Sequence, residues 1–313
     1  MQPPIRYVYV LATSYSGTTL LSLLLDSHPR IVSIGEVDNI IQNFPADPPY
    51  PCSCGRAISE CEFFTRVRDL CGREGVELDL QNFQVRLGAR LPRTARRLLF
   101  GSAFGSALEL GWVVQSRDRL LGHLPMYRQH VKQVFDRNIS IARASLEVSG
   151  KGLFVDSSKA VARVPHLLRR PDIDLRLIHV VRDVRAVASS ALKREWEQAG
   201  AGNMARYWVR THKAALRLGA LAGEDRYFRF RWEDFCAAPE VVLDRICEFL
   251  GVEPVDLVSR VNAETHHVIG NRIRLQPVRP IRSDEAWREA LEPSQRAAAE
   301  RYAGELSRSF GYA

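Results

Sequence analysis

Runs of apolar, β-branched residues alternate along this chain with segments in which apolar residues recur at helical spacing. Residues 5–13 are dense in β-branched and aromatic side chains, which predicts a buried strand. A turn of small residues follows. Residues 19–27 then have helical spacing, which ends before His28-Pro29 because proline disfavours helix at the preceding residue. Strand, glycine-containing turn and helix in this order predict the beginning of an α/β unit.

The same alternation continues to the end of the chain. Further strands are predicted at residues 152–155, 175–181 and 227–231, and helices at residues 161–169, 184–194, 205–221, 239–250 and 294–310. Residues 43–61 are rich in proline and cysteine and predict a loop, whereas residues 266–280 have little periodicity. Because strands alternate with helices, we expect an α/β fold with a mostly parallel central sheet covered by helices on both faces.

One long region departs from this alternation. Residues 67–149 are polar and rich in arginine, with apolar residues at mixed helical spacing, and we interpret them as a helical insertion. The chain has no internal repeat and no linker rich in glycine, serine or proline. A single domain over residues 1–313 is therefore expected.

Composition and charge narrow the class of protein. Apolar residues make up 46% of the chain and charged residues 26%, which is ordinary for a globular protein and excludes disordered and fibrous classes. A net charge of +8 and a pI near 9.4 fit an anionic ligand or polymer, or simply a solvated basic surface. No run approaches the ~18 uninterrupted apolar residues of a membrane helix, and the first residues lack signal-peptide features. We expect a cytoplasmic protein with no membrane partner.

Six cysteines include three that crowd into one short segment, Cys52, Cys54 and Cys61. A cytosolic protein rarely has a structural disulfide framework, so reduced thiols are the simplest interpretation. A zinc site would need a fourth ligand, for which Cys71 is the nearest candidate. The spacing does not match a standard zinc pattern, and the sequence predicts no metal site.

The first motif with chemical content lies between the first predicted strand and helix and reads Ser14-Tyr15-Ser16-Gly17-Thr18-Thr19-Leu20. Such a turn presents backbone N–H groups and hydroxyls to an anion, and the helix adds the positive end of its dipole. A nucleotide-hydrolysing P-loop would have a lysine after the glycine and an earlier loop glycine, and this turn has neither. The motif favours binding of phosphate or phosphosulfate over Mg²⁺-dependent phosphoryl chemistry. The alternative is an ordinary turn capped by Ser or Thr.

The second motif follows the strand predicted at residues 175–181. Arg182 lies where this strand meets a helix, and Ser190 lies about two helical turns further on, on a similar face. A guanidinium and a hydroxyl in this arrangement can hold a phosphate dianion. The alternative is a surface pair of Arg182 with Asp183, which would contribute little to stability.

Together the two motifs resemble those of sulfotransferases that depend on 3′-phosphoadenosine 5′-phosphosulfate (PAPS). The first resembles the loop that binds the 5′-phosphosulfate, a role that falls here to Tyr15, Ser16, Gly17, Thr18, Thr19 and Leu20. The second resembles the 3′-phosphate motif, with Arg182 and Ser190. The resemblance implies a P-loop-like three-layer α/β sandwich, PAPS as co-substrate and adenosine 3′,5′-bisphosphate as product.

Within that family the chain is most similar to the tyrosylprotein and carbohydrate sulfotransferases and their bacterial relatives. Gly35-Glu36 resembles a segment that follows their phosphosulfate loop, which implies that Glu36 is the catalytic base rather than a capping or surface residue. The same comparison implies that Lys159 stabilises charge on the sulfuryl and bridging oxygens. The alternative for Lys159 is an exposed lysine at the start of a helix.

Four further residues are interpreted from the same resemblance. Trp232 replaces an adenine-contacting tyrosine of the family and could stack on the base or belong to the core. A late segment, Gly270-Asn271-Arg272-Ile273-Arg274, resembles the basic loop that closes over the nucleotide, which makes Arg272 or Arg274 a phosphate ligand. Tyr15 stands where many relatives have arginine, so the loop lacks one charge.

Other interpretations of the sequence remain. One is a nucleotide phosphotransferase of P-loop architecture, although the loop lysine is missing. Another is a non-enzymatic binder of acidic polymers through the Arg-rich residues 86–97. We expect the sulfotransferase instead, acting on a small-molecule, glycan or peptide acceptor with residues 67–149 shaping the acceptor pocket, and no nucleic acid partner. The identity of the acceptor is not encoded in any motif.

Overall fold

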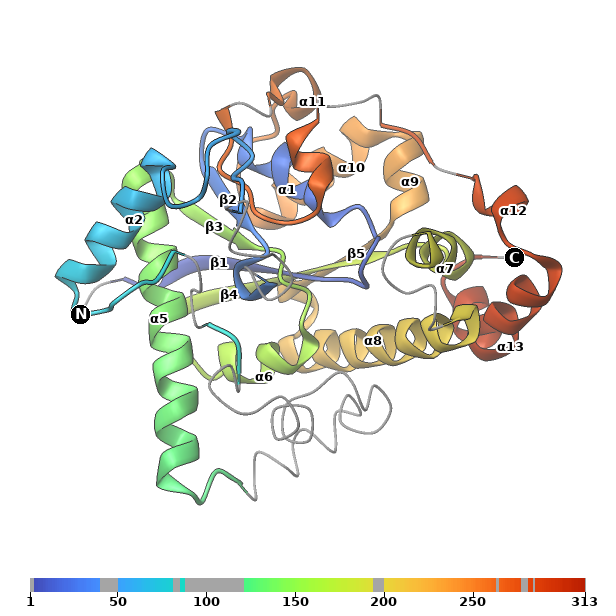
Figure 1. Cartoon of the computed structure of the whole chain (residues 1–313), viewed down its shortest axis with the longest axis horizontal. Helices are drawn as coiled ribbons and strands as arrows, with labels where there is room; N and C mark the ends of the chain where they lie inside the picture. Colours follow the sequence, from blue (N-terminus) through green and yellow to red (C-terminus); the bar gives the residue numbers. More distant parts are fainter. Residues whose placement is uncertain are drawn as a thin grey trace.

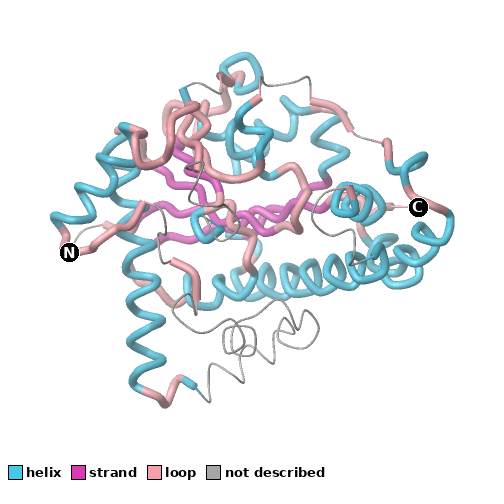
Figure 2. The backbone as a smooth tube through the Cα atoms, viewed as in Figure 1, coloured by secondary structure: helices cyan, strands magenta, loops and turns pink. Residues whose placement is uncertain are grey.

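The structure is a computed structural model that describes residues 3–39, 50–80, 85–87, 121–193, 200–262, 265–276, 281–283 and 285–312. A five-stranded, all-parallel sheet in the order β2-β3-β1-β4-β5 crosses its centre (Figure 1; magenta in Figure 2). The strands are β1 (Ile5–Leu11), β2 (Ile31–Gly35), β3 (Leu153–Asp156), β4 (Ile173–Val181) and β5 (Tyr227–Arg231). The predicted parallel α/β sheet is confirmed.

Helices connect and cover these strands. The longer ones are α1 (Thr18–Asp26), α2 (Glu62–Arg73), α5 (Pro125–Ser149), α7 (Val184–Leu192), α8 (Gly200–Ala222), α10 (Pro239–Leu250) and α13 (Pro293–Ser309). The shorter ones are α6 (Val164–Leu167), α9 (Trp232–Ala237), α11 (Leu257–Arg260) and α12 (Trp287–Ala290). Turns of 3₁₀ helix are η1 (Val37–Asn39), η2 (Val161–Arg163), η4 (Glu224–Arg226) and η6 (Arg272–Leu275).

The sheet separates two apolar cores because successive side chains of a strand point to opposite faces. On β1, Tyr7 and Tyr9 lie in the core that α2, α5, α6 and α8 cover. Val8 and Val10 lie in the other core, which α1, α9, α10 and α11 cover. In Figure 1, α1, α9, α10 and α11 lie above the sheet, α6 and α8 lie below it, and α2 and α5 lie at its left end. This three-layer arrangement is the one the sequence predicted.

The order of the strands creates a switch point between β1 and β4. These strands are neighbours in full register, from Ile5 opposite Ile173 to Leu11 opposite His179. The chain leaves β1 into α1 on one face of the sheet, and the long helix after β4, α8, covers the other face. In open α/β sheets, ligands bind beyond the carboxyl ends of strands at such a point. The loops after β1 and β4 are therefore where a ligand site is expected.

Most predicted elements agree with the structure within a few residues, and the differences have physical reasons. Strand β2 was not predicted, because its five residues include Ser33 and Gly35 and it is defined by pairing with β3 rather than by local pattern. The helix expected at residues 161–169 is instead η2 followed by the short α6. The short helix α9 was also missed.

The described parts of the expected insertion belong to the main core. Helix α2 begins at Glu62, before the predicted boundary, and packs against α5. Phe64 of α2 and Phe135 of α5 lie in the same apolar cluster as β1. Residues 88–120, with most of the Arg-rich stretch at 86–97, lie outside the described residues, so the extent of the insertion stays a prediction. No helix in the described part of the chain is long and apolar enough to span a membrane.

A buried pair of histidines predicts how stability depends on pH. His179 of β4 and His212 of α8 are buried, with Nε2 of His179 2.7 Å from Nδ1 of His212. Burial lowers the pKa of His179 well below its usual value and that of His212 to about 3. The unfolded chain takes up protons below about pH 6.5 and the folded chain does not. We expect the free energy of unfolding to decrease as pH falls below that value, by about 1.4 kcal/mol per pH unit for each histidine kept neutral.

Urea unfolding at neutral and mildly acidic pH measures this dependence. His212→Gln should lower stability at neutral pH but flatten its decline on acidification. His123→Gln is the control, because His123 is exposed. Equal slopes in wild type and His212→Gln would contradict the assignment.

Candidate active site

The loop between β1 and α1 curls around the N-terminus of α1 at the carboxyl edge of the sheet. Tyr15 and Gly17 both have left-handed backbone, with φ of 64° and 79°. Inside the loop, Oγ1 of Thr13 and Oγ of Ser16 lie 2.8 Å apart. Left-handed residues in a tight turn direct successive N–H groups to one concave side, and the first turn of a helix leaves its N–H groups without helical partners. This backbone suits an anion.

Tyr15 shapes this loop through its packing. A left-handed conformation costs a non-glycine residue about 1–3 kcal/mol, so the surroundings must hold it. The side chain of Tyr15 packs against the apolar cluster at the end of β4, which includes Val181 and Val184. The residue that stands where many relatives have arginine thus anchors the loop to the neighbouring strand.

Gly17 is required by space as well as by conformation. A Cβ atom on Gly17 would lie 2.3 Å from Cη2 of Trp232, which begins α9. The Trp232 ring is 6% exposed and packs on Phe235 at a centroid distance of 5.0 Å. The sequence left two interpretations of Trp232 open, stacking on the base or a place in the core. Its burial supports a core residue whose ring packs against the loop at Gly17.

Arg182 joins the two sequence motifs. It directly follows β4, and its Nη1 donates to the carbonyl oxygen of Tyr15 at 2.6 Å. Its own carbonyl oxygen accepts from Nε1 of Trp208 at 2.8 Å, which fixes the backbone at the strand end. Residues 167 positions apart in sequence therefore meet across the switch point.

The remainder of the second motif lies on α7. Asp183 caps this helix, since its Oδ1 accepts from the backbone N of Arg185 at 2.8 Å. Asp183 also forms an ion pair with Arg185, so it does not pair with Arg182 as the alternative interpretation supposed. Ser190 is half-buried in the last part of α7. Its role beside Arg182 in binding a phosphate stays a prediction.

Glu36 and Lys159 form an ion pair beside the N-terminus of α1. Nζ of Lys159 donates to Oε1 of Glu36, and the two side chains are only 11% and 8% exposed. The same Nζ lies 3.3 Å from Oγ1 of Thr18, the first residue of α1. The structure thus brings the predicted base and the predicted lysine together with the anion loop. The alternatives of a surface glutamate and an exposed lysine do not fit this burial.

The position of Glu36 depends on a contact with a distant segment. Its backbone N donates to the carbonyl oxygen of Ile269 at 3.0 Å, and the N of Ile269 donates to Ile34 at 2.9 Å. Gly35 has φ of 79°, and a Cβ there would lie 1.9 Å from the Ile269 oxygen. Gly35 therefore allows the late segment to pair with the end of β2.

A hydrogen-bonded turn after β3 holds Lys159, which has a left-handed φ of 67°. Asp156 accepts from the backbone N and the hydroxyl of Ser158, and its Oδ2 accepts from Tyr7 at 2.8 Å. The N of Ser157 donates to the Gly35 oxygen at 2.9 Å. The sequence singled out Lys159 in this turn but missed the supporting role of Asp156, for which the adjacent hydroxyl residues were the available signal.

The two late arginines have different roles. The guanidinium of Arg274 is fully buried over the ring of Tyr50 and donates to the carbonyl oxygens of Gly270 and Pro51. This burial and the two backbone acceptors favour a structural role for Arg274 over that of a phosphate ligand. Arg272 is exposed on η6 and stays the predicted ligand.

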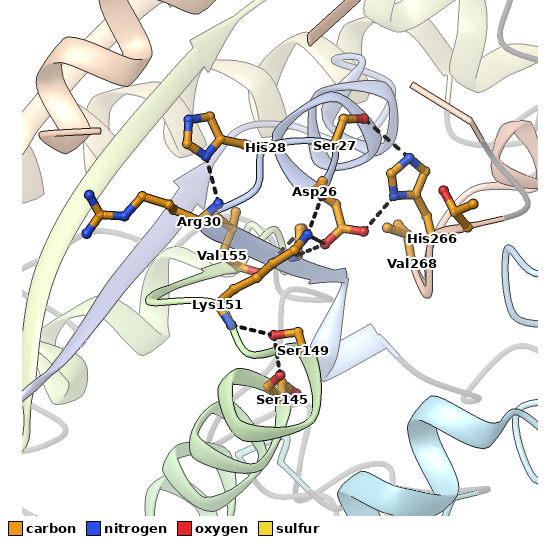
Figure 3. Close-up of polar contacts among 12 residues, drawn as sticks. Asp26, Ser27, His28, Arg30, Ser145, Ser149, Lys151, Val155, His266 and Val268 are labelled. Atoms are coloured by element: carbon orange, nitrogen blue, oxygen red, sulfur yellow. Dashed lines mark hydrogen bonds and ion pairs between the residues drawn. The ribbon is translucent and has the colours of Figure 1, made fainter. Parts of the chain in front are cut away.

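Figure 3 shows how the C-terminal end of α1 contacts His266, four residues before Gly270. Nδ1 of His266 lies 2.6 Å from Oδ2 of Asp26, and its Nε2 lies 3.3 Å from Oγ of Ser27. Asp26 Oδ1 also accepts from the N of Ser33 at 2.8 Å and lies 3.5 Å from Nζ of Lys151. His266 is therefore a buried residue that holds these segments together.

His28 is structural as well. Its Nε2 lies 2.9 Å from the carbonyl oxygen of Glu253, and its Nδ1 accepts from the N of Arg30 at 3.0 Å. Both ring nitrogens are thus engaged with the backbone, one of them as shown in Figure 3.

The crowded cysteines lie next to this late segment. Cys52, Cys54 and Cys61 gather around His267 rather than around Cys71. Cys71 is ten residues beyond Cys61 on α2, about 15 Å along the helix. The nomination of Cys71 as a fourth ligand is wrong for that reason.

The fold is an α/β sheet with a topological switch point, and the loop after β1, whose backbone suits an anion, lies at that point. A profile of the sulfotransferase family matches residues 8–256. The sulfotransferase domain of the Synechococcus PCC 7002 olefin synthase is similar over 100% of this chain and 97% of its own, with 20% identity and a TM-score of 0.53. The sulfotransferase domain from the curacin biosynthetic pathway is similar over 98% of each chain, with 18% identity and a TM-score of 0.53. A search of curated proteins found no match.

The chain belongs to the sulfotransferase family, since the family profile covers most of it. It is a sulfotransferase with the P-loop-like fold of that family, as the sequence predicted. The similarity to the two solved domains concerns the fold alone. The resemblance to the tyrosylprotein and carbohydrate branch stays a prediction.

Proposed function

We propose that the chain binds PAPS across the switch point between β1 and β4 and transfers its sulfuryl group to an acceptor hydroxyl or amine. The observation that carries this proposal is the hydrogen bond of 2.6 Å from Arg182 to the Tyr15 oxygen. It joins the two motifs that resemblance assigns to opposite phosphates of one nucleotide. The 5′-phosphosulfate would lie in the loop of Tyr15 to Leu20, and the 3′-phosphate at Arg182 with Ser190.

Three side chains would perform the transfer at the end of this loop. Glu36 accepts the proton of the acceptor, and Lys159 stabilises charge on the sulfuryl and bridging oxygens. Thr18 Oγ1 lies 3.3 Å from Nζ of Lys159, so a phosphosulfate at the start of α1 would lie beside this ammonium group. The donor then competes with Glu36 for Lys159, which leaves the carboxylate available to the acceptor.

The step is a direct in-line displacement. The acceptor oxygen or nitrogen forms a bond to sulfur while the bond from sulfur to the bridging oxygen breaks. The proton of the acceptor passes to Glu36, and the electron pair of the broken bond stays on the 5′-phosphate of adenosine 3′,5′-bisphosphate. Positioning and electrostatic stabilisation supply most of the acceleration. No fold-level observation selects among small-molecule, glycan and peptide acceptors.

A transfer screen tests the proposal. The purified chain is incubated with sulfur-labelled PAPS and a panel of phenols, alcohols, glycans, amines and tyrosine peptides, with mass spectrometry of products. Calorimetry compares adenosine 3′,5′-bisphosphate with ATP–Mg²⁺. Sulfated product together with binding of the bisphosphate is expected. Binding of ATP–Mg²⁺ alone would favour a phosphotransferase, and heparin retention that the bisphosphate does not affect would favour a polymer binder.

Gly17→Ala provides a local test of the loop. We expect at least a tenfold loss of affinity for adenosine 3′,5′-bisphosphate, because the added methyl meets the Trp232 ring and displaces the loop. Gly150→Ala is the matched control, because Gly150 also has positive φ, 68°, but open space around its Cβ. Calorimetry on both variants measures the difference. An unchanged affinity in Gly17→Ala would place the nucleotide elsewhere.

A further inference from the structure

Three cysteine sulfurs and one imidazole nitrogen from distant parts of the sequence converge next to the candidate active site. The four ligand atoms of Cys52, Cys54, Cys61 and His267 all lie within 4.8 Å of one another. Sγ of Cys61 lies 3.7 Å from Sγ of Cys52 and 3.8 Å from Sγ of Cys54. Nδ1 of His267 lies 3.2 Å from Sγ of Cys61 and 3.8 Å from Sγ of Cys52.

We propose that these four residues form a structural Zn²⁺ site. Zinc bonds of about 2.3 Å to sulfur and about 2.0–2.1 Å to nitrogen make a tetrahedron with edges of about 3.5–3.8 Å. Four of the six separations, at 3.2–3.8 Å, are close to those edges, and all six are within 4.8 Å. A disulfide would need two sulfurs at about 2.05 Å, far shorter than the 3.7 Å between Cys52 and Cys61.

The local backbone places the first three ligands. Cys52-Ser53-Cys54-Gly55 is a tight turn in which Gly55, with φ of 83°, donates its N–H to the Cys52 oxygen at 3.0 Å. Cys61 is the N-cap residue of α2, so its sulfur lies at the positive end of a helix, where a thiolate is stabilised. The turn and the helix start thus bring three soft ligands to one point.

The fourth ligand explains why the spacing matched no standard zinc pattern. His267 is 206 residues beyond Cys61, so no local motif could include it. Its ring stacks on Phe63 at 4.7 Å with an interplanar angle of 5°, and Nδ1 lies within reach of the sulfurs. Three thiolates and one imidazole are a ligand set that selects zinc over Mg²⁺ or Ca²⁺. A set of four protein ligands is typical of structural sites, since catalytic sites keep a position open.

The site would tie the cysteine loop to the segment that positions Glu36. Oγ of Ser53, within the turn, donates to the His266 oxygen at 2.5 Å and accepts from the Val268 N at 2.8 Å. The next residue, Ile269, pairs with the end of β2 beside Glu36. Zinc at His267 therefore stabilises a segment in direct contact with the candidate base, although metal binding itself does not depend on the proposed reaction.

Metal analysis of the purified full chain tests the proposal. Protein from zinc-supplemented medium, kept reduced, should contain about one zinc per chain by plasma mass spectrometry. Cys54→Ser and His267→Gln should each lower this content more than tenfold, whereas Cys71→Ser, outside the group, should retain it. Cys54 is the preferred variant because it is only partly buried. Wild type with less than a tenth of a zinc per chain would overturn the proposal.

A second measurement on wild type does not depend on the folding of any variant. The chain is stripped with a chelator under reducing conditions and then titrated with Co²⁺, whose visible d–d and thiolate charge-transfer bands report a tetrahedral site. We expect these bands to appear at one equivalent and to vanish on addition of Zn²⁺, which also raises the melting temperature of the stripped protein. Absence of the bands, or a disulfide among these cysteines in the reduced protein, would overturn the proposal whatever the sulfuryl-transfer activity.

Discussion

Replacing Glu36 with glutamine is expected to lower kcat for sulfuryl transfer by about 10²–10⁴-fold while leaving affinity for adenosine 3′,5′-bisphosphate nearly unchanged. Glutamine keeps the size of the side chain and an oxygen for Lys159 but cannot take a proton from the acceptor. Steady-state kinetics on an acceptor identified by the transfer screen, with calorimetry of the bisphosphate, separate the two effects.

Asp38→Asn is the matched control for this variant. Asp38 lies two residues beyond Glu36, is largely buried and forms an ion pair of 3.8 Å with Arg163, and burial raises its pKa. Like Glu36→Gln, this substitution replaces a carboxylate with an amide of the same size, and it does so two residues away. We expect a change in stability but retention of most of kcat. Full activity in Glu36→Gln, or an equal loss in both variants, would show that Glu36 is not the base.

Replacing Lys159 with methionine is expected to lower kcat by about 10²–10³-fold and to weaken binding of the bisphosphate much less. The product lacks the sulfuryl group whose charge Lys159 is proposed to stabilise, so the lysine matters more in the transition state than in the product complex. If the whole loss appears as weaker bisphosphate binding with kcat unchanged, Lys159 is a binding group only.

Stability must be separated from catalysis in this variant, because Lys159 and Glu36 are a nearly buried pair. Removing one partner of a buried pair costs about 3–5 kcal/mol, since the other charge is left without compensation. The double variant Glu36→Gln/Lys159→Met removes both charges and should regain much of that stability without regaining activity. Lys193→Met, at an exposed lysine, serves as the control for loss of positive charge.

Much of the architecture was predictable because local periodicity reports secondary structure. The strands at β1, β4 and β5 and the helices α1, α7, α10 and α13 agree with the prediction to within a few residues. Strand β2 was not predicted because its residues form a strand only by pairing with β3 and with Ile269, which are far away in sequence. A short segment without alternation has no local signal for such pairing.

Most of the candidate site could be predicted as well. As with β2, the prediction was incomplete where contacts between distant segments decide what a residue does. Tyr15 to Leu20, Arg182, Glu36 and Lys159 were all singled out from motifs, and the structure brings the loop, Arg182 and the Glu36–Lys159 pair to one edge of the sheet. The sequence could not separate Arg272 from Arg274, because a charged residue in a basic loop gives no local sign that it will be buried and bonded to carbonyl oxygens, as Arg274 is.

The sequence by itself predicted the order of most strands and helices, the loop with Gly17 that suits an anion, and the residues proposed to perform the transfer. The elements and the loop follow from side-chain periodicity and turn chemistry, which act over a few residues, whereas Glu36 and Lys159 were assigned through the resemblance to the family. Only the tertiary structure decided that Arg182 meets the Tyr15 oxygen, that Ile269 pairs beside Glu36, and that His267 completes the cysteine group. Those contacts join residues more than 160 positions apart, and they depend on how the packed sheet places whole segments rather than on any local pattern.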